Sequence, residues 1–408
     1  MTAVHLCIPV YDEREWLPDT LAGLASQEWD RSGEPFEVWV CVNQGPQTPE
    51  RIRDANRETL HWLERTRGHW PFRLHVLDAT SPPAAPHARE AGVGWARRHL
   101  FRQVVARVGT DFIGVSLDAD THLEPNYLSE VVRAFARHPN AVGLAAPFYH
   151  RLPQDPRQQL NLLRYELYIR YYQINLWRIG SPYAFVALGS AMAFRGWAYA
   201  AARGFPVRAA GEDFYLLQAL RKIGPLIRWI DSRVYPASRP SERVPFGTGI
   251  LVAEEDLGLQ RRRFPFFAPS SFELLGRTYA MLPDFFRAHR ELPIGDFLER
   301  ELKGYGAFDR MRGNFKDERR FVKAWHERVD GLRILQVLRF FEPQREPSAA
   351  LDAERLGALF EGAGDALRQD AFSERNLAEL DALRDRLCRW EARFQRRFMA
   401  DWKADARW

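Results

Sequence analysis

The first 146 residues alternate between short apolar runs and stretches with helical spacing, and this alternation restricts the fold more than any other feature. The helical stretches carry apolar residues three and four positions apart, as at Leu17, Leu21 and Leu24. Strands that alternate with helices predict a mostly parallel sheet with helices on both faces, a Rossmann-like α/β fold. The predicted strands cover residues 4–10, 36–42, 72–77, 112–118 and 141–146, and the predicted helices cover residues 17–25, 50–67, 88–105 and 125–137.

The pattern changes after Pro156. A long aromatic helix is predicted at residues 160–179, followed by a strand at 190–194, a helix at 212–222 and a strand at 227–230. Residues 238–249 are rich in Ser, Arg, Pro and Gly and predict a mobile loop. The sequence is helical in pattern from about Leu292, with a linker at residues 342–347. We therefore expect an α/β domain over residues 1–245, a connecting segment over 246–291 and a helical region over 292–408.

The composition fits a globular protein with a sizeable core, because 46% of the 408 residues are hydrophobic and 27% are charged. The net charge of +5 suits a small anionic ligand or a lipid surface. Nucleic acid is not an expected partner, because no concentrated Lys/Arg run has aromatic residues interleaved with it.

The cysteines and the apolar segments indicate where such a chain resides. Cys7, Cys41 and Cys388 lack metal-ligand spacing and predict buried thiols in a reducing compartment. The longest uncharged stretch, between Arg178 and Arg195, is too short for a membrane-spanning helix, and no signal segment opens the sequence. We expect a cytoplasmic protein, with peripheral contact at the inner face of a membrane as the alternative.

Two carboxylates, Asp118 and Asp120, close the apolar run at residues 112–117. Side chains two apart on a strand point to the same face, and open α/β sheets bind ligands at the carboxyl ends of their strands. Two like charges held close together need a counter-charge, and a divalent cation bound by oxygens supplies one. For an isolated motif of this kind, a simple Asp-rich turn is the alternative.

Three further segments place charged groups at the same predicted edge. Asp12 and Glu13 follow the first strand, where acids also suit a helix N-terminus. Arg89 opens a predicted helix and opposes its dipole, so a pyrophosphate partner would explain it; a surface arginine is the alternative. Glu212 and Asp213 begin another helix, either as ordinary capping acids or with one of them as a general base.

The loop at residues 238–243 adds two guanidinium groups, those of Arg239 and Arg243. Such a loop can close over a diphosphate and stabilise it as it leaves, or it can simply be solvated.

In this order, these elements resemble the family 2 glycosyltransferases of GT-A fold. The match rests on residues 8–13, Ala88-Arg89 with Gly92, residues 118–120 and residues 211–213, within roughly residues 3–235. The resemblance implies an inverting transfer of a sugar, of hexosyl type, from a nucleotide diphosphate donor to an acceptor hydroxyl. It leaves open whether the acceptor is a glycan, a lipid-linked molecule or a small molecule.

The resemblance also implies roles for individual residues. Asp120 would bind Mn²⁺ or Mg²⁺, and Asp118 would support the metal through water or contact the ribose. Asp213 would be the base, with Glu212 orienting the acceptor beside it. The residues implied around the donor are Pro9, Tyr11, Glu13, Asn43, Arg89, Arg239 and Arg243.

The chain departs from the family pattern in places. Asn43 and Gln44 stand where many relatives carry an acidic pair for the nucleobase, and no His follows Asp213 until His289. The Gln-x-x-Arg-Trp motif of processive synthases is absent, which favours a single-addition enzyme.

Three other functions place different requirements on the sequence. A nucleotidyltransferase usually has a Gly-rich phosphate loop after its first strand, where this chain has the charged residues 11–15. A dinucleotide oxidoreductase lacks support because no G-x-G-x-x-G follows a strand. A non-catalytic binding or scaffold protein of the same fold remains an alternative.

The aromatic segment at residues 264–267 has two possible roles. It either dips into a membrane surface near a lipid-linked acceptor or packs in the protein.

Overall fold

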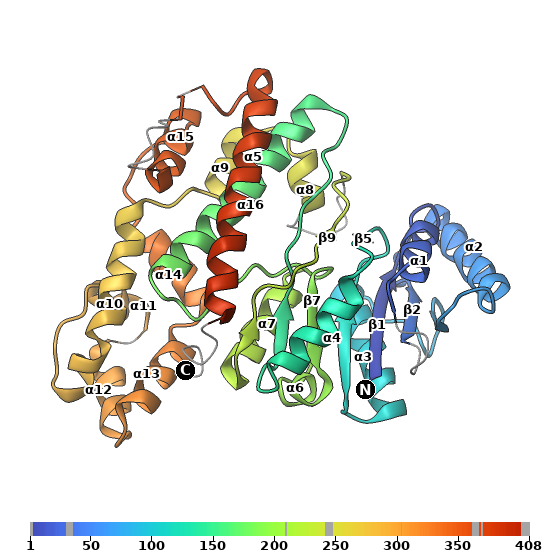
Figure 1. The fold of residues 1–408 in the computed structure, drawn as a ribbon, viewed down its shortest axis with the longest axis horizontal. Helices are drawn as coiled ribbons and strands as arrows, with labels where there is room; N and C mark the ends of the chain where they lie inside the picture. Colours follow the sequence, from blue (N-terminus) through green and yellow to red (C-terminus); the bar gives the residue numbers. More distant parts are fainter. Residues whose placement is uncertain are drawn as a thin grey trace. The chain divides into compact units, whose positions relative to one another are not determined.

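The computed structural model describes residues 3–29, 36–208, 210–240, 248–302, 304–360, 367–368 and 370–400 (Figure 1). It divides into two compact units. Unit 1 consists of Met1–Arg151 and Ala187–Ile250, and unit 2 consists of Leu152–Val186 and Leu251–Trp408. The domains expected from the sequence, with boundaries at residues 245 and 291, are each one continuous stretch of chain. Unit 2 of the structure instead combines Leu152–Val186 with the residues from Leu251 onward.

The main sheet of unit 1 has seven strands in the order β3-β2-β1-β4-β7-β6-β8. Strands β3, β2, β1 and β4 are parallel to one another, β7 is antiparallel to β4 and β6, and β8 is parallel to β6. The mostly parallel sheet expected from the sequence is therefore confirmed. Its strands are β1 (Ala3–Val10), β2 (Glu37–Asn43), β3 (Arg73–Ala79), β4 (Phe112–Ser116), β6 (Gly143–Ala145), β7 (Met192–Arg195) and β8 (Leu226–Ile227).

Helices flank this sheet, with α3 packed on β1 and β2, and α7 packed on β6. All residues of β1 after Ala3 are buried, as expected of a central parallel strand that is covered on both faces. A separate two-stranded sheet pairs β5 (His122–Leu123) with β9 (Val234–Tyr235). The helices of unit 1 are α1 (Leu17–Ala25), α2 (Glu50–Thr66), α3 (Val93–Val108), α4 (Tyr127–Arg137), α6 (Gly196–Ala201) and α7 (Glu212–Ile223).

Gly114 shows how tightly the centre of the sheet is packed. A Cβ atom at this position would lie 2.6 Å from the ring of Phe194 and 2.8 Å from that of Phe101. Only glycine leaves room for the two aromatic rings beside β4.

One helix boundary differs from the prediction. The helix expected from residue 88 begins at Val93, because Gly92 has a φ of 155° that does not fit a helix. Arg89 consequently lies in an exposed turn before α3 rather than at its N-terminus.

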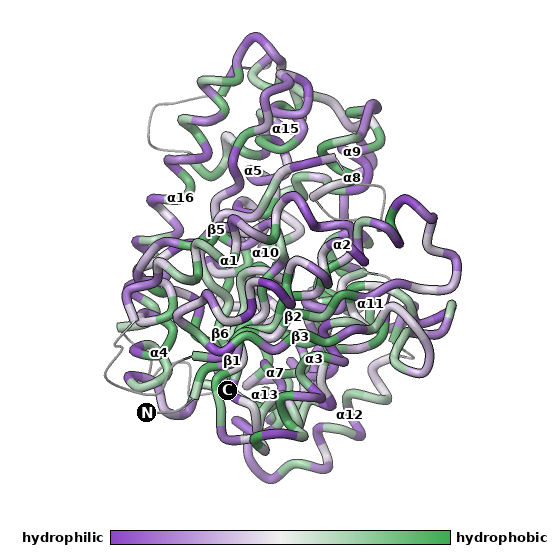
Figure 2. The backbone as a smooth tube through the Cα atoms, turned by 90° about the vertical axis from the view of Figure 1, so that its right-hand side faces the viewer, coloured by the Kyte–Doolittle hydropathy of each residue, from purple (hydrophilic) through white to green (hydrophobic). Residues whose placement is uncertain are grey.

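Unit 2 is helical in its described residues, and the chain passes into it within α8 (Thr248–Ala253). Helix α5 packs along α16, and Figure 1 shows the two helices side by side. In Figure 2 the tube alternates between green and purple along helices such as α15, as expected of amphipathic helices. The other helices are α5 (Pro156–Arg178), α9 (Leu257–Arg263), α10 (Pro269–Arg287), α11 (Gly295–Glu301), α12 (Tyr305–Gly313), α13 (Glu318–Arg328), α14 (Gly331–Phe340), α15 (Ala349–Gly357) and α16 (Leu377–Ala400).

The aromatic segment at residues 264–267 belongs to the core of unit 2. Phe266 and Phe267 are completely buried, and the Tyr171 hydroxyl donates a hydrogen bond of 2.6 Å to the Phe267 carbonyl. Of the two expectations for this segment, packing is the one found, and these two rings are not exposed to a membrane.

Cys7, Cys41 and Cys388 are free and buried, as expected. A search of the described helices found none with the length and apolar character needed to cross a bilayer.

Candidate active site

The acidic residues that follow β1 and β4 lie at one edge of the unit 1 sheet. The two strands are neighbouring and parallel, with Cys7 paired to Ser116, so the segments that leave them emerge together. Strand β4 ends at Ser116, and Asp118 and Asp120 stand in the turn after it, where the Thr121 amide donates to the Asp118 carbonyl. The two aspartates are therefore not on one strand face, and each meets a different arginine.

Asp118 is held by Arg97, which also binds Glu212. An Nη atom of Arg97 lies 2.5 Å from Asp118 Oδ1, and its other Nη atom donates to Glu212 Oε1. The side chains of Arg97 and Glu212 are 4% and 3% exposed, whereas that of Asp118 is 37% exposed. This triad links the turn after β4 to the first residue of α7 and leaves Asp118 open to a ligand.

Arg97 was not anticipated from the sequence, although the sequence contains a signal for it. It stands between Gly94 and Phe101 on the buried stripe of α3, where an apolar residue is expected. A Cβ atom on Gly189 would lie 2.1 Å from the Arg97 guanidinium, so glycine at this position makes room for the buried charge.

Asp120 and Glu13 are joined by Arg239. Its Nε atom donates to Asp120 Oδ2 at 2.9 Å, and an Nη atom donates to both carboxylate oxygens of Glu13. The guanidinium also lies over the Trp16 ring, 5.5 Å from its centroid. Burial opposes the charge on Arg97 and Arg239, but the adjoining carboxylates more than offset it, so the pKa of each guanidinium is raised.

Asp213 stands beside the Arg97 triad as the second residue of α7. It is half-buried, and its Oδ1 accepts a hydrogen bond of 2.7 Å from the Phe214 amide. Burial, followed by the neighbouring charge of Glu212, raises its pKa to about 7, although Arg97 acts in the opposite direction. A carboxyl group with this pKa can exchange a proton near neutral pH, as a general base must.

Two arginines thus hold four carboxylates together. Arg97 pairs with Asp118 and Glu212, and Arg239 pairs with Asp120 and Glu13. Because opposite charges at these distances attract, each arginine joins segments that are far apart in the sequence.

The donor set suits a hard divalent cation in chemistry, because the oxygens of Asp118 and Asp120 are the ligands that Mg²⁺ and Mn²⁺ prefer. Within the described part of the chain, no group of three or more His, Cys, Asp or Glu could hold a metal ion by itself. Mg²⁺ is commonly bound through one or two carboxylates together with substrate phosphates, so the residues present fit a metal that arrives with a donor.

The residues expected around the nucleotide lie at the ends of β1 and β2. Pro9 and Asn43 are buried, and Tyr11 is half-buried. The side-chain amide of Asn43 donates a hydrogen bond of 2.9 Å to the Val10 carbonyl, so it stabilises the end of β1 in this structure. Asp12, which follows Tyr11, has a φ of 60° and pairs with Arg51 at 2.7 Å.

Two further arginines, Arg89 and Arg243, are expected near the donor. Arg89 is exposed in the turn that precedes α3. Arg243 lies outside the described residues.

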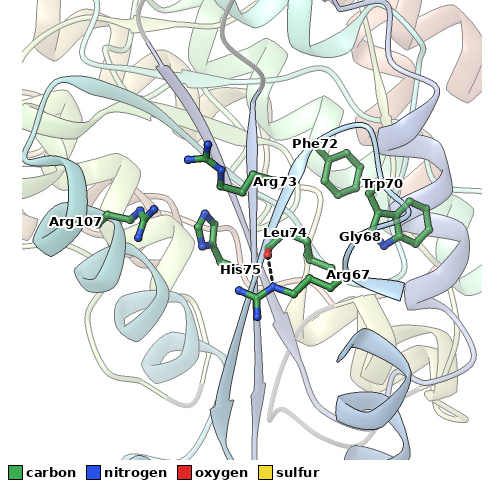
Figure 3. A pocket seen from close by; sticks show the side chains of 8 residues that line it. All are labelled: Arg67, Gly68, Trp70, Phe72, Arg73, Leu74, His75 and Arg107. Atoms are coloured by element: carbon green, nitrogen blue, oxygen red, sulfur yellow. Dashed lines mark hydrogen bonds between the residues drawn. The ribbon is translucent and has the colours of Figure 1, made fainter. Parts of the chain in front are cut away.

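Unit 1 also contains a pocket that lies away from this cluster (Figure 3). It has a volume of about 560 Å³ and is lined by residues near the start of β3, such as Arg73 and His75, and by Arg107 of α3. The start of a parallel strand is at the opposite edge from Asp118. In Figure 3 the guanidiniums point in different directions, and that of Arg67 donates to the Leu74 carbonyl. We therefore place the candidate active site at the arginine–carboxylate cluster.

Comparisons with known proteins add little to this description. A scan against protein-family models found no match, and neither did a search of curated proteins. Among solved structures, the chain is similar to residues 1–349 of S. aureus TarS in complex with UDP-GlcNAc, at 14% identity and a TM-score of 0.39, covering 93% of this chain and 90% of that one. It is also similar to the mannosyltransferase PcManGT from Pyrobaculum calidifontis in complex with GDP-Man and Mn²⁺, at 16% identity and a TM-score of 0.35, covering 97% of this chain and 84% of that one. Because both TM-scores are below 0.5, we draw no conclusion about function from these similarities. The assignment of function rests on the chain's own residues.

Proposed function

We propose that the chain is an inverting glycosyltransferase that transfers a sugar from a nucleotide diphosphate donor to an acceptor hydroxyl in a single addition. The observation that carries the proposal is the position of Asp213. This carboxyl group, with a pKa of about 7, lies beside an arginine–carboxylate cluster at the carboxyl edge of a mostly parallel sheet.

In the proposed reaction, Asp213 takes the proton from the acceptor hydroxyl. The acceptor oxygen forms a bond to the anomeric carbon from the face opposite the diphosphate, while the bond to the diphosphate oxygen breaks and that oxygen keeps the electron pair. Attack from the opposite face inverts the anomeric centre. Glu212 orients the acceptor, and Arg97 holds Glu212 and Asp118 in place.

Asp120, with Asp118, would hold Mn²⁺ or Mg²⁺, which when bound supplies positive charge for the departing diphosphate. In this structure Arg239 forms an ion pair with Asp120. In the proposed reaction the Arg239 guanidinium leaves the Asp120 carboxylate, so that the metal can bind there, and contacts the diphosphate instead. Arg89 and Arg243 are proposed to assist it. Pro9, Tyr11, Glu13 and Asn43 are proposed to border the nucleotide.

The first prediction concerns the rate. The turnover number is expected to rise with pH around pH 7, because Asp213 must lose its proton to act as a base. A pH profile of the turnover number at saturating donor measures this rise. A flat profile between about pH 5.5 and 8.5 would remove Asp213 from the role of base.

The same pKa has a consequence for stability that needs no substrate. The pKa of Asp213 in the folded chain is above its ordinary value of 3.8, so the folded state binds the proton more tightly than the unfolded state. Its contribution to stability is present below about pH 4 and is lost as the pH rises toward 7. The difference in unfolding free energy between Asp213→Asn and wild type should therefore grow in favour of the variant over this range.

The second prediction concerns donor binding. One nucleotide diphosphate sugar, with Mn²⁺ present, is expected to raise the melting temperature of unit 1 by roughly 5 to 10 °C at a hundredfold excess over its dissociation constant. Asp120→Ala should abolish the part of this shift that depends on the metal. The matched control is Asp54→Ala, an exposed acid on α2. If Asp120→Ala binds donor and metal like wild type, the metal assignment is wrong.

A further inference from the structure

Unit 2 contains a pocket lined by five arginines, and the proposed function does not use it. The cavity has a volume of about 210 Å³. Its arginines come from separate parts of the chain, two from α9, one from α14 and two from the region of α15. They are Arg261, Arg262, Arg339, Arg345 and Arg355.

The carboxylates around this pocket neutralise only some of these arginines. Asp352 pairs with Arg261 at 3.1 Å and with the buried Arg164 at 2.8 Å. Glu342 pairs with Arg355, and Glu354 pairs with Arg345 at 2.7 Å. These three carboxylates therefore pair with four guanidiniums, and two arginines of the pocket are left over.

The surplus charge is on Arg262 and Arg339. Both are exposed, and neither has a carboxylate within ion-pair distance in the described part of the chain. Arg339 uses one Nη atom to donate to the Arg263 carbonyl at 3.1 Å, which orients the guanidinium and leaves its other donors available. Arg261 likewise meets Asp352 through its Nε atom.

Two aromatic residues, Phe266 and Phe267, form an apolar part of the pocket lining. Phe266 and Phe267 are completely buried, and Arg355 donates a hydrogen bond of 2.6 Å to the Phe266 carbonyl. This hydrogen bond orients the Arg355 guanidinium before a ligand arrives, which lowers the entropic cost of binding.

The size and the donors of the pocket select the ligand. Guanidinium groups present planar forks of N–H donors that match phosphate oxygens. A cavity of about 210 Å³ is smaller than the roughly 300–1,000 Å³ of pockets that enclose drug-sized ligands. It therefore suits a phosphate or diphosphate group rather than a whole nucleotide.

We propose that this arginine pocket of unit 2 binds a phosphate or diphosphate group. The group belongs either to a free phosphorylated molecule or to the headgroup of a lipid. The site is separate from the cluster at Asp118, and the inference does not depend on the proposed function.

The test uses inorganic pyrophosphate and the full chain, with EDTA present so that binding through a metal at Asp120 is suppressed. Titration calorimetry measures affinity, and hydrogen exchange locates the binding. We expect protection of residues 257–267 and 339–355. The double variant Arg262→Gln/Arg339→Gln removes two charged donors from the ligand and should bind about a hundredfold more weakly.

Matched controls separate this site from general charge effects. The double variant Arg277→Gln/Arg310→Gln removes two exposed arginines from other helices of unit 2 and should bind like wild type. Asp54→Ala, which removes an exposed acid on α2 of unit 1, should also bind pyrophosphate like wild type. Equal affinity in Arg262→Gln/Arg339→Gln and wild type, or protection confined to other residues, would overturn the proposal.

A second arm distinguishes the two sources of the phosphate. Sedimentation with vesicles of phosphatidylglycerol and phosphatidylcholine, compared with phosphatidylcholine alone, reports headgroup binding. Binding to the anionic vesicles that pyrophosphate displaces and that Arg262→Gln/Arg339→Gln loses would identify a lipid headgroup. Pyrophosphate binding without vesicle binding would identify a free phosphorylated ligand.

Discussion

Replacing Asp213 by Asn is expected to reduce transfer by about 10²- to 10⁴-fold, because general base catalysis contributes a factor of this size. Asn keeps the shape of the side chain and can still accept the hydrogen bond from the Phe214 amide, so α7 should begin as before. It cannot take a proton from the acceptor hydroxyl. The rate of nucleoside diphosphate release, measured under saturating donor, reports the loss.

Two further measurements make this result specific to the base. Donor affinity should stay within about twofold of wild type, because Asp213 is not placed against the diphosphate in the proposed site. The melting temperature near pH 7 should be unchanged or raised, because the substitution removes a carboxylate whose charge is disfavoured by burial. A rate close to that of wild type would mean that another group accepts the proton.

Replacing Arg97 by Met should cause the largest loss of stability that we expect from one substitution. It leaves the Glu212 carboxylate buried without its partner and removes the partner of Asp118. Breaking a buried ion pair by removing one member costs about 3–5 kcal/mol. Denaturation by urea should show the midpoint falling by the corresponding amount, with unit 1 as the affected part.

A double variant tests the physical reason. Arg97→Met/Glu212→Gln removes the uncompensated charge together with the arginine, and it should recover a substantial part of the lost stability. Arg239→Gln is the matched comparison, because Arg239 also joins two carboxylates but its side chain is 25% exposed. Its cost should be smaller. Equal costs for the two arginines, or no recovery in the double variant, would contradict the role given to the buried triad.

Much of the fold is predictable from the sequence, because apolar periodicity determines which residues can be buried. The spacing of Leu17, Leu21 and Leu24 predicts a helix at residues 17–25, and α1 has these bounds. The apolar run from Val4 to Val10 likewise predicts β1 to within one residue. These elements depend on local pattern alone.

The details of the site depend on residues far apart in the sequence, and local pattern does not contain them. Arg97 meets Glu212, 115 positions away, and Arg239 meets Glu13, 226 positions away. The sequence places carboxylates at the correct edge of the sheet and suggests a metal as their counter-charge. It does not reveal that guanidiniums pair with them in this structure.

The division into two units also could not be predicted from the local sequence pattern. Helix α5 lies between β6 and β7 of unit 1 along the chain, yet it belongs to unit 2, where it packs on α16. Nothing in the composition of residues 152–186 indicates a partner that begins at residue 377.

The central claim is that the arginine–carboxylate cluster supports transfer from a nucleotide diphosphate sugar. Its most direct test is ³¹P and ¹H nuclear magnetic resonance of a panel of such donors incubated with the chain and Mg²⁺. We predict that wild type converts one donor to its nucleoside diphosphate and a sugar of initially inverted anomeric configuration, and that Asp213→Asn does not. If no donor is turned over although one binds, the result would contradict the account and favour a non-catalytic binding protein.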